Sequence, residues 1–507
     1  MAEVGRGRAE RARHVQLVRR SGDRPGRLAL PRRRARRAAR VRCRNDSDRV
    51  RILRGARSPV LRGPRAARSR PRAPRAQRLR ADRARVDVPA GADRAAVNVY
   101  FHTFGCKANQ YDTERVRQAF DSRGAIVVDD PALADLAVIN SCTVTSESEV
   151  KLRRFVRHVA TTSHTETIVM GCAAALDDGA IAALPGVRAV VANADPDDVL
   201  RAAGFANVGA RHVVPLQRGG RSRALLKIQD GCDEHCTFCA TTLARGNNRS
   251  RPVADLVEEA RALAEQHAEI VLTGVHIGTY GQDVSRVGSP GAAPRGTLGH
   301  LLEALIESVP SVRFRLGSVE ATEVDDTLAR LLIEAPRHLA AHLHAPLQSG
   351  SNHVLKRMGR HWYTAESYRE RIEWLAERLP VFGLGADVIA GFPGEAQDDH
   401  HASLTLLHAL PFTYLHVFPF SVRPDAPAAK LSGQLRPEVI RARARELREL
   451  GEAKAAAYRE YRRGQTADGV VSGRQKGHIE VMTQDYLSVY LDTGRWDGRP
   501  RFEVIVN

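Results

Sequence analysis

The sequence predicts an α/β protein with two successive series of alternating strands and helices, followed by a small all-β module. Strand-like and helical stretches alternate from residue 97 to about 204 and again from 224 to about 435, and short strands broken by Gly and Asp turns follow from about 468. The chain of 507 residues, 43% of them apolar, is long enough for two to four folded domains. We predict domains at 96–208, 218–435 and 465–507, with a connecting helix at 436–464.

The segment 1–95 differs from the rest in composition. The first hundred residues hold 31 Lys and Arg against 8 Asp and Glu, whereas the remaining residues hold 47 against 50. This Arg, Ala, Pro and Gly-rich segment lacks a sustained apolar period, so we predict a disordered basic extension. It is either an RNA-binding arm, an organellar transit peptide, or a non-native extension translated from too early a start.

Apolar stretches of membrane-spanning length are absent from the sequence. No run of eighteen or more apolar residues occurs, and the N-terminus lacks the apolar core of a secretory signal. We therefore expect a cytoplasmic protein with no membrane partner.

The first series predicts a doubly wound α/β domain. Strands are expected at 97–101, 125–128, 136–140 and 167–170, with helices opening near Asp112 and covering 149–160. The polar, Gly- and Arg-rich stretch 211–223 is typical of a linker.

The second series predicts a partial (β/α) barrel, with chemistry at the carboxyl ends of its strands. The expected strands are 224–228, 270–272, 313–316, 339–344, 384–389 and 414–418, separated by helices such as 253–266, 365–378 and 399–410. The charged helix 436–463 should pack through Ile440, Leu447, Leu450 and Ala457. The short strands near 470–471, 478–482, 486–491 and 502–506 predict a β-barrel-like module of a size common among nucleic-acid-binding modules.

Six of the seven cysteines lie outside the basic extension, which holds Cys43. Cys232, Cys236 and Cys239 share one loop directly after the first barrel strand. Three thiolates this close together can ligate three irons of a 4Fe-4S cube and leave the fourth iron open. A structural zinc site with His235 as its fourth ligand is the alternative.

Cys106, Cys142 and Cys172 each follow a predicted strand of the first domain. Parallel strands would deliver the three thiolates to one edge of the sheet, where open α/β sheets place their ligands. A single scattered cysteine is more often a buried small apolar residue, but three in matching positions favour a site.

The cysteine loop resembles the signature of the radical-SAM superfamily, and the three strand-end cysteines upstream of it resemble the arrangement of the methylthiotransferase family. The resemblance covers about four-fifths of the chain, from Val97 onward. The motifs that carry it include 226–232, 245–252, 269–278, 346–351, 355–360 and 390–395. Within the family, segments 105–114, 142–145 and 272–278 look most like the branch acting on N6-threonylcarbamoyladenosine next to the anticodon of tRNA.

The resemblance implies a transferase with two 4Fe-4S clusters and S-adenosylmethionine. The cluster of Cys232, Cys236 and Cys239 would bind S-adenosylmethionine and cleave it to a 5'-deoxyadenosyl radical. The auxiliary cluster of Cys106, Cys142 and Cys172 would bind the sulfur, which one S-adenosylmethionine methylates and which is then transferred to carbon-2 of the base. A tRNA substrate, an electron donor of flavodoxin or ferredoxin type and a monomeric state are expected.

Other residues are candidates for S-adenosylmethionine or substrate contacts. By resemblance, Phe238 packs near the adenine. Gly274, Glu320, Gln348 and Gly391 stand at or after strand ends, which suits S-adenosylmethionine contacts as well as it suits turn glycines and surface polar groups. His344, Lys356 and Arg357 are candidates for facing substrate or phosphate, although a solvated helix face is the favoured interpretation for Lys356 and Arg357.

The terminal module resembles the TRAM domain, an RNA-binding β-barrel common in this family, and Arg474, Lys476, Arg495 and Arg499 supply its positive charge. The chain departs from many relatives at Thr241 and Thr242, where they have Ile-Pro, and at Ala173, where they have an aromatic. Within the family, the alternative substrates are isopentenyladenosine in tRNA and a ribosomal-protein aspartate. The alternative from another class is a zinc-stabilised nucleic-acid-binding protein.

Overall fold

The computed structural model describes residues 97–143, 146–163, 165–205, 223–283, 296–475 and 477–507. The basic extension with Cys43, most of the predicted linker 211–223 and Lys476 lie outside the described residues. In the described part of the chain, no helix is long and apolar enough to cross a membrane.

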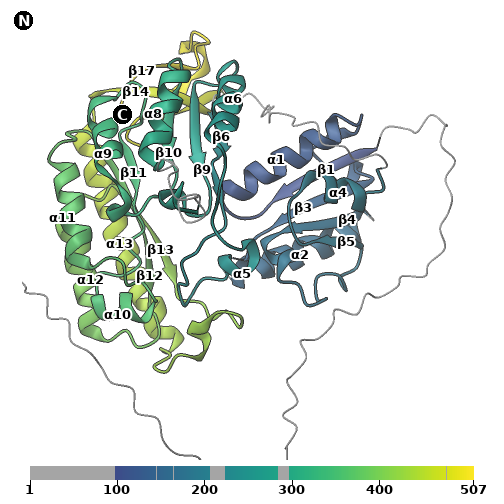
Figure 1. The fold of residues 1–507 in the computed structure, drawn as a ribbon, viewed down its shortest axis with the longest axis horizontal. Helices are drawn as coiled ribbons and strands as arrows, with labels where there is room; N and C mark the ends of the chain where they lie inside the picture. The colour runs from purple at the N-terminus through teal and green to yellow at the C-terminus, as the bar shows by residue number, and fades with distance from the viewer. Residues whose placement is uncertain (1–96, 144–145, 164, 206–222, 284–295, 476) are drawn as a thin grey trace, which may run out of the picture. The chain divides into compact units, whose positions relative to one another are not determined.

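The first domain holds a parallel five-stranded sheet in the order β2-β1-β3-β4-β5 (Figure 1). Its strands are β1 (Asn98–Thr103), β2 (Ile126–Val128), β3 (Leu136–Ser141), β4 (Glu166–Gly171) and β5 (Val187–Val191). The strand order reverses between β1 and β3, which is the position where doubly wound sheets place their ligands.

Helices cover both faces of this sheet. α1 (Lys107–Asp121) and α4 (Pro196–Ala202) bury Val116, Phe120 and Leu200 against one face. α2 (Ser146–Thr162) and α3 (Cys172–Ala175) bury Leu152 and Ala173 against the other. The predicted doubly wound α/β domain is confirmed, although α1 begins earlier than the expected start near Asp112 because Cys106 ends the strand-to-helix turn.

The second series forms a partial barrel of parallel strands. β6 (Arg223–Lys227), β9 (Glu269–Thr273) and β10 (Arg313–Leu316) pair in the order β10-β9-β6, and β11 (His342–His344), β12 (Gly383–Ala390) and β13 (Tyr414–Pro419) follow in sequence. Isolated parallel bridges at Phe314 and Ser318 join β10 to the β11 region. The outer helices are α6 (Val253–Ala264), α8 (Leu298–Ser308), α9 (Asp326–Glu334), α11 (Ala365–Ala376) and α12 (Gln397–Ala409) (Figure 1).

Side chains alternate between the two faces of the barrel wall. Leu272, Phe314, Leu343 and Ala386 belong to the large apolar cluster under the helices. Because successive strand residues point to opposite faces, the residues between them line the concave inner face. This inner face is polar, and it includes Arg223, Glu269, Arg313, Arg315, His342, His344, Asp387, Tyr414 and His416.

The long helix α13 (Pro437–Arg462) packs beside β13 and β12. Leu447 and Leu450 of the predicted stripe are buried and Ile440 is partly buried, whereas Ala457 is exposed, so the prediction is wrong for Ala457. The last turns of the helix are held by polar contacts instead, since Arg462 is buried and donates to Asp485 at 2.8 Å.

The C-terminal module is a four-stranded antiparallel sheet in the order β16-β15-β14-β17. Its strands are β14 (Thr466–Gln475), β15 (His478–Thr483), β16 (Ser488–Asp492) and β17 (Arg501–Ile505). It packs against the amino ends of the barrel strands, where Arg313 donates to Asp468 at 2.9 Å and Arg315 donates to the carbonyl of Thr483 at 2.8 Å. The module therefore covers the end of the barrel opposite to the cysteine loop.

Candidate active site

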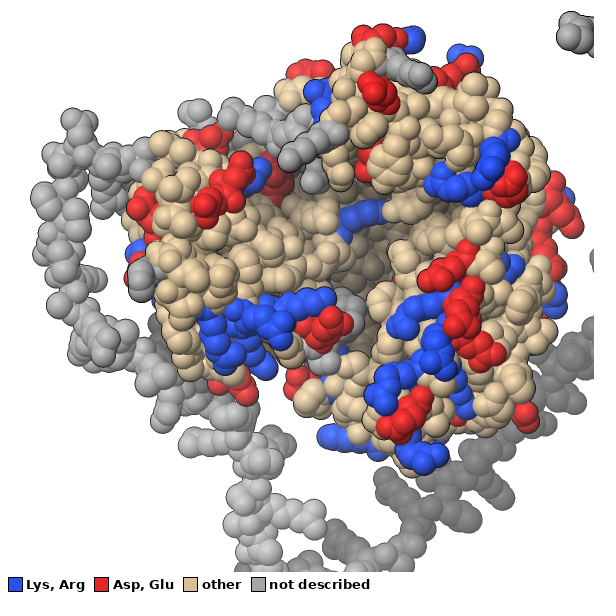
Figure 2. All heavy atoms as spheres, turned by 180° about the vertical axis from the view of Figure 1, so that it is seen from behind, with Lys and Arg blue, Asp and Glu red and all other residues tan. Residues whose placement is uncertain are grey.

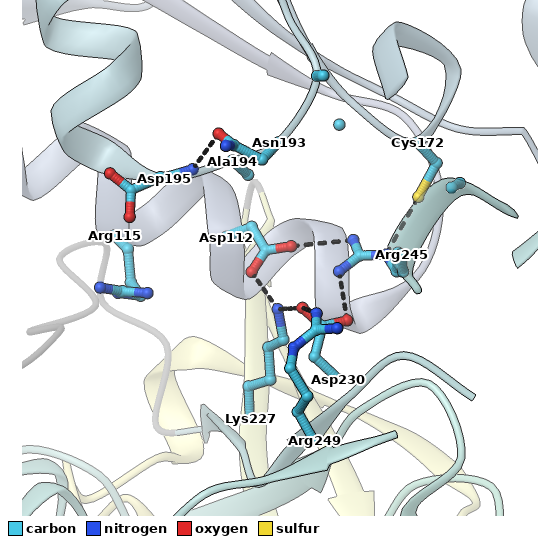
Figure 3. Close-up of a pocket in the computed structure, with 13 residues that line it drawn as sticks. Asp112, Arg115, Cys172, Asn193, Ala194, Asp195, Lys227, Asp230, Arg245 and Arg249 are labelled. Carbon is cyan, nitrogen blue, oxygen red and sulfur yellow. Dashed lines mark hydrogen bonds and ion pairs between the residues drawn. The ribbon is translucent and has the colours of Figure 1, made fainter. Parts of the chain in front are cut away.

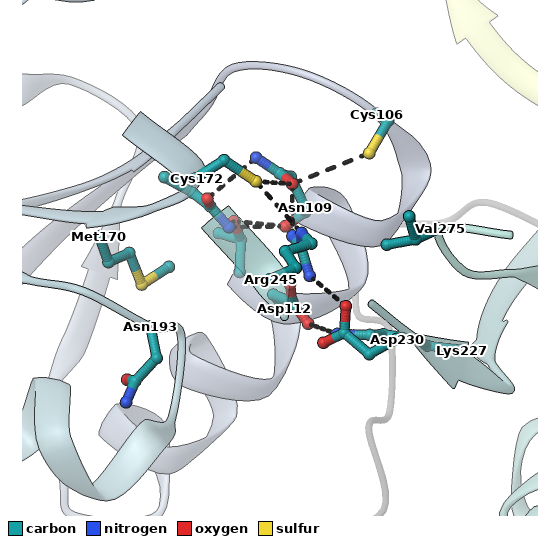
Figure 4. Close-up of polar contacts among 12 residues, drawn as sticks. Cys106, Asn109, Asp112, Met170, Cys172, Asn193, Lys227, Asp230, Arg245 and Val275 are labelled. Atoms are coloured by element: carbon teal, nitrogen blue, oxygen red, sulfur yellow. Dashed lines mark hydrogen bonds and ion pairs between the residues drawn. The ribbon is translucent and has the colours of Figure 1, made fainter. Parts of the chain in front are cut away.

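Cys106, Cys142 and Cys172 converge at the carboxyl edge of the first sheet, after β1, β3 and β4. The amide of Asn109 lies among them, with its Oδ1 3.8 Å from Cys106 Sγ and 3.9 Å from Cys172 Sγ (Figure 4). Gly105 has φ +109°, and a Cβ there would stand 3.0 Å from Cys142 Sγ. The glycine is thus required both by its backbone conformation and by the close approach of the thiol.

Asn109 is held in place by the strand ends. Its Nδ2 donates to the carbonyls of Ser141 at 2.8 Å and Phe104 at 3.0 Å, and the side chain is 1% exposed. The same amide therefore fixes the ends of β1 and β3 relative to each other, where two of the cysteines begin their turns.

Cys232, Cys236 and Cys239 lie on a loop enclosed by the short antiparallel pair β7 (Gln229–Asp230) and β8 (Arg249–Ser250). The loop closes on itself, because the amide of Cys232 donates to the carbonyl of Gly246 at 3.0 Å. The sulfurs receive hydrogen bonds from backbone amides: Glu234 N lies 3.4 Å from Cys232 Sγ, and Thr241 N lies 3.3 Å from Cys239 Sγ.

The donor set of both groups suits an iron-sulfur cluster with one open iron. Burial raises the pKa of Cys236 to about 12 and also raises the pKa of Cys172, so these sulfurs need a cation to be held as thiolates. Cationic groups already point at them, since Arg360 Nη1 lies 3.4 Å from Cys236 Sγ. His235, the alternative fourth zinc ligand, is exposed.

Arg245 connects the two groups of cysteines. It lies on α5 (Thr241–Arg245), which follows Cys239 directly, and its Nε is 3.1 Å from Cys172 Sγ (Figure 3). Its Nη2 donates both to Asn109 Oδ1 at 2.7 Å and to Asp112 Oδ2 at 2.9 Å (Figure 4). Five residues of helix thus link the radical-SAM-type loop to the first sheet.

A cavity of about 330 Å³ lies beside this contact (Figure 3). Lys227 pairs with Asp112 and with Asp230, at 2.7 Å in each case, and Arg245 pairs with the same two carboxylates at 2.9 Å. Arg245 and Lys227 therefore form a closed set of ion pairs between the first domain and the barrel, and this set forms part of the cavity wall.

The structure places two predicted S-adenosylmethionine residues near the cysteine loop. Phe238 packs edge-to-face with Phe392, with 6.4 Å between ring centroids. Glu320 is buried, pairs with Arg360, and accepts from Trp362 Nε1 at 2.5 Å. Its carboxylate is thus anchored by two neighbours rather than free at the surface.

The other three predicted residues lie at strand ends for different physical reasons. Gly274 packs on Gln229, whose carbonyl would stand 2.7 Å from a Cβ. Gln348 has φ +64°, a strained conformation for a residue with a side chain, and such strain often marks functional positions. Gly391 has φ +76°, and the space for its Cβ is filled by Ile440 at 2.7 Å. Packing against Ile440 of α13 is therefore enough to require a glycine at position 391, without any contact to a ligand.

Of the three substrate candidates, His344 lies on the inner face of the barrel. Its Nε2 is 3.0 Å from Asp387 Oδ1, and His416 Nδ1 is 3.3 Å from the same oxygen. Lys356 is exposed, as expected for a solvated helix face. The same expectation is wrong for Arg357, which is partly buried and donates to the carbonyls of Pro393 and Ser432, both at 2.8 Å.

Several residues near the sulfurs were not assigned a role from the sequence. His276 Nδ1 lies 3.6 Å from Cys232 Sγ, and its Nε2 is 2.8 Å from Glu323. Thr241 Oγ1 lies 3.0 Å from Cys239 Sγ, so the departure from the common Ile-Pro pair brings a hydroxyl to a cysteine. His276 stands in the recognised segment 269–278 and Thr241 at the noted departure, but only the folded chain shows their contacts.

Comparison with known proteins agrees with this arrangement. Residues 98–192 match the model of the Uncharacterized protein family UPF0004, and residues 226–407 match that of the Radical SAM superfamily. The Threonylcarbamoyladenosine tRNA methylthiotransferase MtaB of Bacillus subtilis is 36% identical over 71% of this chain and 81% of its own. The MtaB protein of Aquifex aeolicus is 31% identical over 78% and 96%. The tRNA-2-methylthio-N(6)-dimethylallyladenosine synthase of Thermodesulfovibrio yellowstonii is 30% identical over 78% and 93%.

The partial barrel with its cysteine loop defines a radical-SAM enzyme. The upstream domain and the relatives narrow this class to one family. The chain belongs to the radical-SAM methylthiotransferase family and is a transferase whose cofactors are S-adenosylmethionine and two 4Fe-4S clusters.

Proposed function

We propose that the protein methylthiolates carbon-2 of N6-threonylcarbamoyladenosine next to the anticodon of tRNA. The MtaB relatives of Bacillus subtilis and Aquifex aeolicus, whose names carry this substrate, support the proposal. The residues around the first cysteine, from Gly105 to Glu114, support it further by their resemblance to that branch.

The observation that carries the proposal is the placement of two cysteine triads within one compact unit, joined by Arg245. We assign the auxiliary cluster to Cys106, Cys142 and Cys172 and the radical-SAM cluster to Cys232, Cys236 and Cys239. When bound, these cofactors supply a carbon radical and a transferable methylthio sulfur, which side chains alone cannot provide.

The residues of the chain bind and orient the clusters and S-adenosylmethionine. Backbone amides of the cysteine loop donate to the sulfurs, and Arg360 places a positive charge beside Cys236. We propose that Phe238, Gly274, Glu320 and Gln348 bind S-adenosylmethionine around the same loop. For Gly391 we propose a backbone contact with S-adenosylmethionine only, because Ile440 already fills the space beside its Cα.

The substrate base would enter the barrel from its open side. One face of the molecule is hollowed, and a Lys or Arg side chain is visible inside the hollow (Figure 2). Basic side chains also flank the hollow, which suits a polyanionic RNA (Figure 2). We further propose that the C-terminal module contacts RNA, with Arg474 stacked on Trp496 at 4.4 Å as one basic position.

The test uses the anaerobically reconstituted protein and anticodon stem-loop RNAs carrying either N6-threonylcarbamoyladenosine or isopentenyladenosine. We expect the methylthio mass increment on the threonylcarbamoyl nucleoside after digestion. An increment only on the isopentenyl nucleoside would overturn the proposal. That second substrate is favoured by the Thermodesulfovibrio yellowstonii relative, whose similarity is close to that of the MtaB proteins.

A further inference from the structure

Two histidines and one aspartate, none of them part of the proposed cysteine clusters, meet on the inner face of the barrel. His344 ends β11, Asp387 lies in β12 and His416 lies in β13, which are three neighbouring strands (Figure 1). Asp387 pairs with His416 across the sheet, and His344 pairs with Gly385, two residues before Asp387. Because side chains two residues apart on a strand share a face, the three side chains project to the same side of the sheet.

The polar atoms of this group are as close together as neighbouring ligands of one metal ion. His344 Nε2 lies 3.0 Å and His416 Nδ1 lies 3.3 Å from the same Asp387 Oδ1, and one ligand atom of each residue lies within 4.8 Å of the other two. In a tetrahedral zinc site with bonds of about 2.0 to 2.1 Å, neighbouring ligand atoms stand about 3.3 Å apart. Two imidazoles and one carboxylate are also a ligand set that zinc takes where its fourth position stays open.

Tyr414 gives His344 the support that metal-binding histidines commonly have. Such histidines donate their other ring N–H to a fixed oxygen, which turns the unprotonated nitrogen to the metal. The Tyr414 hydroxyl lies 3.0 Å from His344 Nδ1 and 2.8 Å from His342 Nε2, so it can accept from the first ring and donate to the second. His344 then faces Asp387 with a bare Nε2, and two facing acceptors repel each other unless a cation stands between them. An added Cβ at Gly385 would overlap the Tyr414 ring, so the glycine makes room for this support.

The exposure of the three side chains increases from one strand to the next. The side chain of His344 is 9% exposed, that of Asp387 is 24% exposed and that of His416 is 54% exposed. The buried ligand is fixed by its neighbours, and the exposed ligand gives an ion a path to the site.

We propose that His344, Asp387 and His416 bind a divalent transition-metal ion, with zinc as the ion that the ligand set fits best. Three protein ligands leave a fourth position, which water or an oxygen of an incoming substrate fills. This site is separate from the two cysteine triads and goes beyond the proposed function. It also differs from the zinc site considered for the cysteine loop, because no sulfur takes part.

The experiment measures zinc binding to the anaerobically reconstituted holoenzyme, whose cysteines are occupied by iron. The wild type, His416→Ala and Tyr414→Phe are dialysed against Zn²⁺ buffered by a chelator, and bound zinc and iron are counted by mass spectrometry. His353→Ala is the matched control, because its exposed ring also contacts a carboxylate, Asp399 Oδ2 at 3.1 Å, but lies outside the proposed site. X-ray absorption at the zinc edge identifies the ligand atoms.

The wild type and His353→Ala should hold about one zinc per chain, with nitrogen and oxygen neighbours at about 2.0 to 2.2 Å. Zinc affinity should fall about 100-fold in His416→Ala and about tenfold in Tyr414→Phe, because the loss of an outer hydrogen-bond partner alone costs about 10- to 100-fold. Iron content should be equal in all four proteins. Equal zinc affinity in the wild type and His416→Ala, sulfur neighbours at about 2.3 Å, or no zinc bound by the wild type would each overturn the inference. The proposed function would stand in each case, because the nucleoside masses decide it separately.

Discussion

Arg245 Nε lies 3.1 Å from Cys172 Sγ, although the two residues are 73 positions apart and belong to different domains. This contact ties α5, the helix that directly follows the second cysteine triad, to a member of the first triad. Arg245 stands six residues after Cys239 and also bonds Asn109, around which the first triad is arranged. We infer that α5 helps to set the separation of the two proposed clusters.

Replacing Arg245 should lower the reduction potential of the proposed auxiliary cluster. The guanidinium stabilises the more negative, reduced state, and a hydrogen bond from a charged group is worth about 1.5 to 3 kcal/mol. Arg245→Gln should therefore shift the potential by about 60 mV or more to the negative side, measured by redox titration. Arg115→Gln, which lines the same cavity, is the control and should leave the potential unchanged. Equal shifts in both variants would contradict a specific role for Arg245.

The buried His342 should make stability depend on pH. Its pKa is lowered by burial and by Arg315, Lys107 and His344, so the folded state resists protonation that the unfolded state accepts. The contribution is fully present above the unfolded pKa of about 6.5 and is lost as pH falls below it. The urea midpoint should thus fall between about pH 7 and pH 5 by more in the wild type than in His342→Gln. Parallel curves would refute this assignment.

Gly391 should not tolerate a side chain. A Cβ would lie 2.7 Å from Ile440 Cγ1, and φ is +76°. Gly391→Ala should cost about 1 to 3 kcal/mol in the free energy of unfolding, as crowding and backbone strain add. Gly179→Ala is the matched control, because φ is +105° there but nothing lies within 4 Å of the added Cβ. The loss should be larger at Gly391, and equal losses would show that the contact with Ile440 is unimportant.

Much of the fold was predictable from the sequence because apolar periodicity sets the strands. β10 covers the predicted residues 313–316, where Phe314 and Leu316 alternate with arginines. The exposed Ala457 was mispredicted because the end of α13 is fixed by a buried ion pair, Arg462 with Asp485, which has no apolar signature.

The site was predictable where chemistry follows short spacing and less so where it depends on packing. The short spacing of Cys232, Cys236 and Cys239 in one loop was enough to predict a cluster site. The contact of Arg245 with Cys172 joins two domains, so no local pattern could reveal it.

The account depends on two separate triads of cysteines, each holding its own cluster. The most direct measurement is the iron content of anaerobically reconstituted protein in which Cys106, Cys142 and Cys172 are all replaced by Ala, compared with the wild type. We predict that iron falls by half and that thiolation stops, while S-adenosylmethionine is still cleaved. Undiminished iron content in the triple variant would contradict the account.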